Sequence, residues 1–329
     1  MCPVWRATYL LLVFVLFPVT YYSQPENSSA AGIDSKQSAV HPHGDFVRVH
    51  DARLWYESEG SGEPIILIAG GPGFSHDYFH PFFTPLSSSF RVIYFDAFGR
   101  GKSDHAKNPH EYSLDRDVED IEGLRQALGL GKISLLGHSY GGFVAQAFAL
   151  RYPGSLRRLI LADTGFSGEM WQANNDNSAA EARNQFPEVW EKIEQVHRQG
   201  FDTCSHEYQD ANKLPLSLLY MFDGSNASKI MEASMNNDVY CAIAGPDADF
   251  IVSGDLGRLD FRGELKNIRV PLLIVVGRYD RVFSPKWSFQ FRQFAPQGKF
   301  VVFEESGHFP FVEETSKMLR VLREFLGEN

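Results

Sequence analysis

Short apolar runs recur along most of this chain, and amphipathic stretches separate them. Uninterrupted runs of this kind are typical of strands that are buried on both faces of a sheet. The runs are residues 65–69, 92–95, 133–136, 159–162, 270–276 and 300–303. Because helix-like stretches lie between successive runs, the pattern predicts a mostly parallel, doubly wound sheet with helices on its faces.

The helix-like stretches carry ordinary start and stop signals. Ser113 can cap a helix that ends near Gly129, and a second helix begins directly after Ser139 and stops before Pro153. A third amphipathic helix begins at Glu314 and extends toward the C-terminus. These positions leave each helix between two predicted strands or after the last one.

The strand rhythm is interrupted between residues 166 and 262, where the sequence is polar and helix-rich. Residues 46–49 and 53–56 are typical of an antiparallel hairpin that opens the regular part of the chain. We therefore expect an α/β fold whose core comprises residues 44–165 and 263–329, with residues 166–262 inserted as a helical cap.

The first 43 residues stand apart from this pattern. Arg6 precedes an apolar run over residues 9–17, an arrangement typical of a secretory signal peptide, here residues 1–22. The run is short for a membrane span, although residues 18–22 could extend it into a signal anchor. Residues 23–43 are rich in Ser, Ala, Gln and Pro, which predicts a disordered leader. The sequence thus predicts a secreted or extracytoplasmic protein, with membrane anchoring as the alternative.

If the protein is exported, two further sequence features become relevant, namely glycosylation acceptors and a cysteine pair. Asn27 and Asn226 each begin an N-glycosylation acceptor pattern, which matters only in a eukaryotic secretory pathway. Cys204 and Cys241 would remain after removal of a signal peptide, and they could form a disulfide in an oxidising compartment. Two unrelated buried thiols are the alternative, because the sequence does not place their Cα atoms within bridging distance.

The formal net charge of −10 argues against a nucleic-acid partner, which requires a basic face. Neither Cys204 nor Cys241 has neighbours spaced as metal ligands, and the Gly-rich segment 96–103 lacks a phosphate-binding pattern. We therefore expect no metal and no cofactor. Segment 96–103 is instead interpreted as a tight loop that supports the site. The oligomeric state is left open.

Residues 137–141 match the pattern G-x-S-x-G between a predicted strand and a predicted helix. Small residues on both sides let the central Ser139 take a strained conformation and project its hydroxyl group. In this setting Ser139 is interpreted as a nucleophile rather than as part of a structural turn. The same setting predicts an α/β-hydrolase fold.

A nucleophilic serine needs a base, and the base needs an orienting acid. Asp280 and His308 follow the last two predicted strands, in the chain order that this fold uses. We expect Ser139 to give its proton to His308 while Asp280 holds the imidazole tautomer. The backbone N–H groups of Gly71 and Tyr140 are the expected oxyanion-hole donors.

Four motifs together resemble the proline iminopeptidase branch of the α/β-hydrolases, peptidase family S33. They are AGGPG at residues 69–73, DAFGRGKS at 96–103, GHSYGG at 137–142 and VYCAIAGP at 239–246. The resemblance covers nearly everything after the leader. It implies a serine aminopeptidase that releases N-terminal residues, often proline, from short peptides or amino-acid amides through an acyl-enzyme on Ser139.

The family binds the free α-amine of its substrate with acidic cap residues, one of them normally a Glu just after Gly-Pro. Here Asp247 and Asp249 follow Gly-Pro, and the resemblance implies Asp249 as the amine-binding residue, with Asp247 as an alternative and Glu207 as a second carboxylate. A solvated surface charge is the competing interpretation for all three. Ala69 and Ala97 also replace a His and a Gln of the family motifs.

Two other functions stay open at this point. One is an esterase, lactonase or related small-molecule hydrolase that uses the same triad and has no amine-binding role for the cap. The other is a non-catalytic adhesion module on this fold, which the intact Ser139, Asp280 and His308 disfavour. The expected partner is therefore a small peptide, amide or ester substrate.

Overall fold

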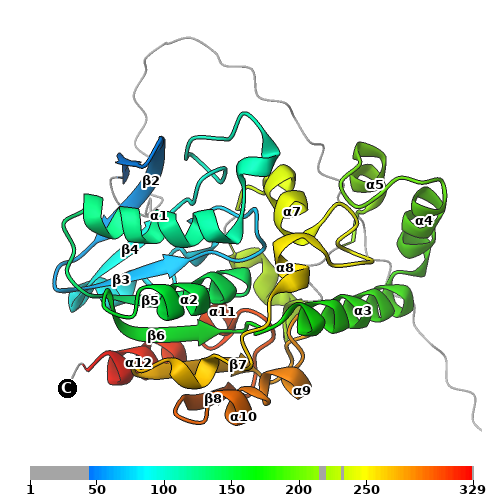
Figure 1. The fold of residues 1–329 in the computed structure, drawn as a ribbon. Helices are drawn as coiled ribbons and strands as arrows, with labels where there is room; N and C mark the ends of the chain where they lie inside the picture. Colours follow the sequence, from blue (N-terminus) through cyan, green and yellow to red (C-terminus); the bar gives the residue numbers. More distant parts are fainter. Residues whose placement is uncertain (1–43, 215–219, 231–232, 328–329) are drawn as a thin grey trace, which may run out of the picture. The chain divides into compact units, whose positions relative to one another are not determined.

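The computed structural model describes residues 44–214, 220–230 and 233–327. Within these ranges eight strands form one sheet, in the order β1-β2-β4-β3-β5-β6-β7-β8 (Figure 1). The strands are β1 (Gly44–Val49), β2 (Ala52–Glu59), β3 (Glu63–Ile68), β4 (Phe90–Phe95), β5 (Ile133–His138), β6 (Leu156–Ala162), β7 (Leu272–Gly277) and β8 (Lys299–Phe303). The pairs β1/β2 and β2/β4 are antiparallel and the other neighbouring pairs are parallel, which confirms the predicted α/β-hydrolase fold.

Helices and short 3-10 turns connect the strands. In the described residues they are η1 (His76–Phe79), η2 (Thr84–Ser88), η3 (Pro109–Glu111), α1 (Leu114–Ala127), α2 (Tyr140–Arg151), α3 (Gly168–Gln185), α4 (Pro187–Arg198), α5 (His206–Ala211), η4 (Gly224–Lys229), α7 (Asn237–Ala244), α8 (Gly254–Arg258), η5 (Leu265–Asn267), α9 (Pro285–Ser288), α10 (Phe291–Phe294), α11 (Pro310–Glu313) and α12 (Thr315–Leu326). The first predicted helix is α1, and the side chain of Ser113 accepts a hydrogen bond from the backbone of Arg116, as a helix cap should.

Alternate residues of the central strands point to opposite faces of the sheet. On one face Ile66 of β3 and Leu135 of β5 pack with α1 and α2. On the other face Leu67 and Leu136 pack with η1, η2, α11 and α12. Because both faces are covered, these strands are apolar along their whole length, as the sequence indicated.

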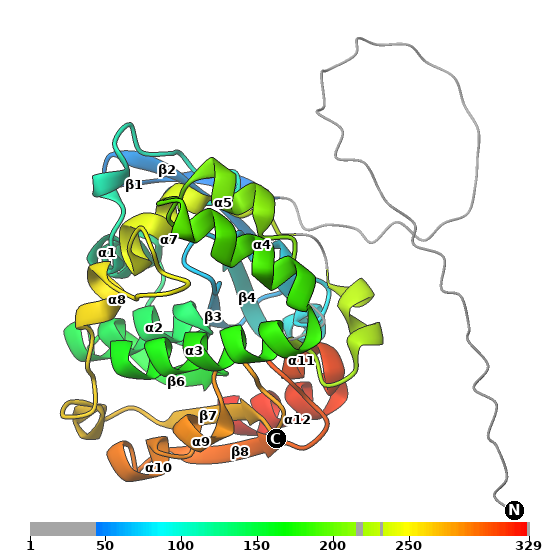
Figure 2. The same ribbon diagram turned by 90° about the vertical axis from the view of Figure 1, so that its right-hand side faces the viewer.

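The chain between β6 and β7 forms the inserted helical cap. It contains α3, α4, α5, α7 and α8, and Figure 2 shows these helices in front of the sheet, on the side toward which the parallel strands point. The cap has a small apolar core of its own, built on Trp190, Ile193 and Tyr208. A disulfide between Cys204 and Cys241, whose Cα atoms are 6.0 Å apart, links the start of α5 to α7.

The sequence-based predictions for the N-terminal region lie outside the described residues. They concern the signal peptide at residues 1–22, the leader at residues 23–43 and the acceptor Asn27. Among the helices that are described, none combines the length and the apolar character that crossing a membrane would require.

Candidate active site

Ser139 occupies a sharp turn between β5 and α2. Its backbone has φ 55° and ψ −123°, a combination that side-chain-bearing residues seldom adopt. The backbone N–H of Ser139 donates to the carbonyl of Ala162, and the hydroxyl of Thr164 donates to the carbonyl of Ser139 at 2.6 Å. These contacts hold the strained turn in place and leave the hydroxyl group of Ser139 at the edge of a cavity.

Glycines make this turn possible because neighbouring backbone passes very close. A Cβ atom at Gly141 would collide with the carbonyl oxygen of Ile68, and one at Gly70 would lie 2.7 Å from the Cβ of Ser139. The G-x-S-x-G pattern therefore reflects a steric requirement of the close approach between the β3 loop and the β5–α2 turn.

His308 and Asp280 are in direct contact, as the sequence predicts. Nδ1 of His308 lies 3.0 Å from Oδ2 of Asp280, and both side chains are buried. The other carboxylate oxygen of Asp280 accepts the backbone N–H groups of Val282 and Phe283, at 2.7 and 2.9 Å. Ser139 and His308 line the same cavity. Because Nδ1 of His308 faces Asp280, Nε2 is the ring nitrogen that remains to exchange a proton with Ser139.

A second carboxyl group, Asp163, lies beside Asp280. It follows β6 with a φ of 45°, is fully buried, and accepts the backbone N–H of Gly277 at 2.6 Å. Burial and the charge of Asp280 raise the pKa of Asp163 well above its ordinary value. Asp280 accepts hydrogen bonds from Val282, Phe283 and His308, so Asp163 is the member of the pair whose neutral form burial favours.

The oxyanion-hole candidates also lie at the cavity. Gly71 lines it, whereas the N–H of Gly70 already donates to the hydroxyl of Tyr78 at 2.6 Å, so Gly71 remains the better donor of the two. Tyr140 is the first residue of α2, where backbone N–H groups have no partner within the helix. Its side chain turns away from the cavity and donates to Asp117.

A buried ion pair supports the loop that carries Gly71. Arg100, in the predicted supporting segment 96–103, binds Asp117 with both terminal nitrogens, at 2.6 and 2.7 Å. Its Nε donates to the carbonyl of Pro72 at 2.6 Å. The pair thereby connects α1 to the glycine-rich loop, and all of its charged atoms have partners at hydrogen-bond distance.

His138 connects the same loop to His308. Burial, and then the nearby His308, lower the pKa of His138 well below its ordinary value, so its ring is neutral. Nε2 of His138 donates to the carbonyl of His308 at 2.9 Å, which leaves Nδ1 to accept from the hydroxyl of Tyr78 at 2.9 Å. Tyr78 in turn accepts from Gly70, so one chain of hydrogen bonds joins the loops around Ser139.

The cavity beside Ser139 has a volume of about 650 Å³, which suits a small organic substrate. Aromatic side chains from core and cap form much of its wall, namely Phe74, Tyr78, Trp171, Trp190, Tyr208, Tyr220, Tyr240, Phe283 and Phe309. The cap contributes one carboxylate to this wall, the partly buried Asp249. Its two oxygens accept the hydroxyl groups of Tyr208 and Tyr240, each at 3.0 Å.

The other two acidic candidates lie elsewhere. Asp247 pairs with Nε2 of His197 at 3.0 Å, and Glu207 is exposed on the first turn of α5. Neither contributes to the cavity wall. The two aspartates lie in one turn, but Asp249 lines the cavity whereas Asp247 pairs with His197.

Asn226, the acceptor inside the described residues, lies in η4 with its amide engaged. Its Nδ2 donates to Glu313 at 3.2 Å, and its Oδ1 accepts from Lys229. A glycan on Nδ2 would have to displace the contact with Glu313.

The sequence did not indicate a second buried group of side chains of the types that bind metals. It consists of Glu57, His76 and His80.

Comparisons with known proteins agree with this geometry. The family model described as alpha/beta hydrolase fold matches residues 63–201. A proline iminopeptidase of Saccharolobus solfataricus is 31% identical over 303 residues, which cover 90% of this chain and 96% of the relative. A proline iminopeptidase of Heyndrickxia coagulans is also 31% identical, over 85% of this chain and 97% of the relative.

A solved structure extends the comparison to three dimensions. The crystal structure of a proline iminopeptidase of Mycobacterium smegmatis has a TM-score of 0.66 and 23% identity, over 86% of this chain and 97% of that one. Fold and site thus define a hydrolase of the α/β-hydrolase class. Within that class the chain belongs to the proline iminopeptidase family, peptidase family S33, as the sequence motifs predict.

Proposed function

We propose that this protein is a serine aminopeptidase that releases N-terminal residues, proline among them, from short peptides or amino-acid amides. The observation that carries the proposal is Asp249, a partly buried carboxylate in the wall of the cavity that also holds Ser139 and His308. An esterase with an apolar acyl pocket has no use for such a group, because burying a carboxylate is costly unless something binds it.

Asp249 can bind a substrate ammonium group with the oxygens that face the cavity. A carboxylate has about four acceptor positions, and the hydroxyls of Tyr208 and Tyr240 use two of them. Asn212 approaches more weakly, at 3.5 Å. An N-terminal α-amine would supply the cation that burial calls for, while the aromatic walls accommodate an apolar side chain such as the proline ring.

The chemical steps follow from the contacts of the triad. Ser139 attacks the carbonyl carbon and gives its proton to Nε2 of His308, and Asp280 stabilises the resulting imidazolium. The N–H groups of Gly71 and Tyr140 stabilise the oxyanion of the tetrahedral intermediate. His308 then protonates the leaving amine, the acyl-enzyme forms on Ser139, and water completes hydrolysis through the same histidine.

The test compares free and blocked amines in the purified protein. Prolyl and alanyl arylamides should be cleaved with a higher kcat/KM than their N-acetylated forms. Asp249→Asn should reduce this preference about 10- to 150-fold, the worth of roughly 1.5–3 kcal/mol for a hydrogen bond between charged groups.

Asp247→Asn is the matched control, since Asp247 lies outside the cavity and should leave the preference unchanged. Equal rates on free and blocked amines, with rapid turnover of p-nitrophenyl esters, would instead favour the esterase function.

We propose further that the protein acts in an exported, oxidising compartment. Two features support this: the apolar run near the N-terminus and the disulfide between Cys204 and Cys241. N-terminal sequencing of the protein recovered from its native host distinguishes a cleaved signal peptide from a retained anchor. An intact N-terminus on a cytoplasmic protein with both thiols reduced would contradict export.

A further inference from the structure

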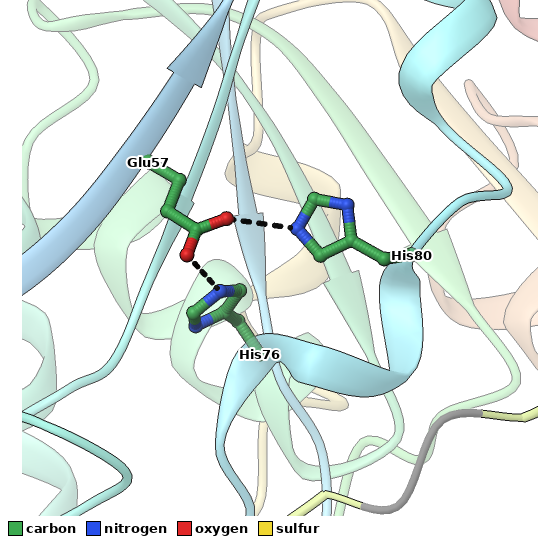
Figure 3. Close-up of side chains that lie close together, drawn as sticks. All are labelled: Glu57, His76 and His80. Carbon is green, nitrogen blue, oxygen red and sulfur yellow. Dashed lines mark ion pairs between the residues drawn. The ribbon is translucent and has the colours of Figure 1, made fainter. Parts of the chain in front are cut away.

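Three buried side chains outside the catalytic cavity face one another across a small space. Glu57 comes from β2, and His76 and His80 come from η1 and its C-cap (Figure 3). The ligand atoms of all three lie within 4.8 Å of one another. None of the three belongs to the wall of the cavity that holds Ser139.

The two histidines face different oxygens of Glu57, at separations close to those of ligands around one metal ion. Nε2 of His76 is 3.6 Å from Oε1 of Glu57, and Nε2 of His80 is 3.2 Å from Oε2. Two ligands bound tetrahedrally at about 2.1 Å from a zinc ion lie roughly 3.4 Å apart. The 3.6 Å separation is too long for a hydrogen bond between Glu57 and His76. Both separations are nevertheless suitable for two side chains that bind one shared metal ion.

The outer contacts orient the three side chains as metal sites require. Nδ1 of His76 lies 2.7 Å from Oδ1 of Asp96, a buried carboxylate that turns Nε2 toward Glu57. Carboxylate-bound histidines of this kind are typical of metal ligands. The indole N–H of Trp55 donates to Oε1 of Glu57 at 3.2 Å and fixes the carboxylate from another side.

The charges around the cluster favour a cation. Two buried carboxylates, Glu57 and Asp96, face the ring nitrogens of His76, at 3.6 and 2.7 Å. Lys102 lies nearby, with Nζ 3.9 Å from Oε1 of Glu57. Its side chain is 57% exposed and lies over the ring of Trp55.

We propose that Glu57, His76 and His80 bind a divalent transition-metal ion, with zinc the best match to two imidazoles and one carboxylate. Water completes the coordination of such a three-ligand site. The ion joins β2 to η1, and η1 also carries Tyr78, which accepts from Gly70 of the glycine-rich loop. Its role is therefore to stabilise the scaffold of the active-site loop, away from the reacting atoms.

The test measures zinc bound to the full-length protein. Protein stripped with a chelator is loaded with ZnCl2, desalted and analysed by mass spectrometry for metal content. The wild type should retain about one zinc ion per chain, and its thermal midpoint should rise by roughly 5–10 °C at free zinc 100 times the dissociation constant. Glu57→Gln and His80→Gln should each lower the affinity at least tenfold.

The matched control is His206→Gln, because His206 forms an exposed pair with Asp210 and also offers an imidazole beside a carboxylate. It should retain zinc as the wild type does. Far-UV circular dichroism establishes that each variant is folded, and visible absorption of bound Co2+ gives a second readout on the milder Glu57→Gln change. The proposal is overturned if the wild type retains no zinc, or if wild type and both cluster variants retain it equally.

Discussion

The hydroxyl group of Tyr78 lies 2.9 Å from Nδ1 of His138, and it also accepts the N–H of Gly70 at 2.6 Å. His138 precedes Ser139 in the chain, and its other ring nitrogen donates to the carbonyl of His308. One tyrosine hydroxyl thus fixes the positions of the glycine-rich loop, the serine turn and the histidine loop relative to one another.

Tyr78→Phe should therefore slow catalysis without removing any reacting group. The change leaves the N–H of Gly70 and Nδ1 of His138 buried without their partner, which costs about 1–3 kcal/mol of stability. We expect kcat to fall about tenfold, because small misplacements of catalytic groups are costly. Tyr94→Phe is the control, since its buried hydroxyl binds Glu59 instead. Equal kcat values for the two variants would contradict the positioning role.

Ser139→Ala should abolish turnover and leave the fold intact. The expected loss in kcat is between about 10³- and 10⁶-fold, as in other serine hydrolases of the triad type. Ser178→Ala, at another serine of the cavity wall, should retain most activity. Steady-state kinetics on the arylamide that the wild type cleaves fastest measure the loss in kcat. Thermal unfolding of both variants shows whether the fold is intact. Full activity in the purified Ser139→Ala protein would exclude Ser139 as the nucleophile.

Asp163 makes stability depend on pH with a definite sign. Its pKa is raised in the folded protein, so above the ordinary value of 3.8 the folded state holds a proton that the unfolded chain has released. The free energy of unfolding should then fall as pH rises toward the folded pKa, by up to about 1.4 kcal/mol per pH unit. Asp163→Asn removes this ionisation, and asparagine tolerates the positive φ at this position.

Chemical denaturation at pH 5 and pH 8 measures this difference. The wild type should lose more stability than Asp163→Asn over that interval, and the variant should be the more stable of the two at pH 8. Parallel losses in the two proteins would show that Asp163 is already ionised in the folded state.

The disulfide should stabilise the cap selectively. It closes a loop with a sequence separation of 37, for which chain entropy predicts a contribution on the order of 3–4 kcal/mol. The double variant Cys204→Ser/Cys241→Ser should therefore unfold at lower denaturant concentration and should no longer respond to a reducing agent. A reductant-insensitive wild type would contradict this assignment of stability to the disulfide.

Most of the fold and the triad could be predicted because their signals are local. Buried strands are apolar at every position, and the positions of Ser139, Asp280 and His308 just after three of these strands place them at one edge of the sheet. Parallel topology thus converts an order along the chain into proximity in space. The contact between Asp280 and His308 could therefore be predicted from strand order alone.

The remaining features depend on pairings that no local pattern reports. Glu57 meets His76 because β2 packs beside η1, a short 3-10 turn that has no periodic signature in the sequence. The neutral state of Asp163 depends on Asp280, more than a hundred residues away. For the cap, the sequence indicated three carboxylates of equal chemistry, and only the folded structure shows that Asp249 lines the cavity while Asp247 and Glu207 do not.

The covalent link between Cys204 and Cys241 has a consequence for selectivity. Cys204 directly precedes the turn into α5, which carries Tyr208, and Cys241 follows Tyr240 on α7. The crosslink therefore restrains the relative positions of the two helices whose tyrosine hydroxyls contact Asp249. Reduction would loosen this acidic corner while the triad, built entirely on the core, stayed in register. We expect the protein to discriminate between free and blocked amines in an oxidising medium, and to keep its hydrolytic activity but lose that preference in a reducing one.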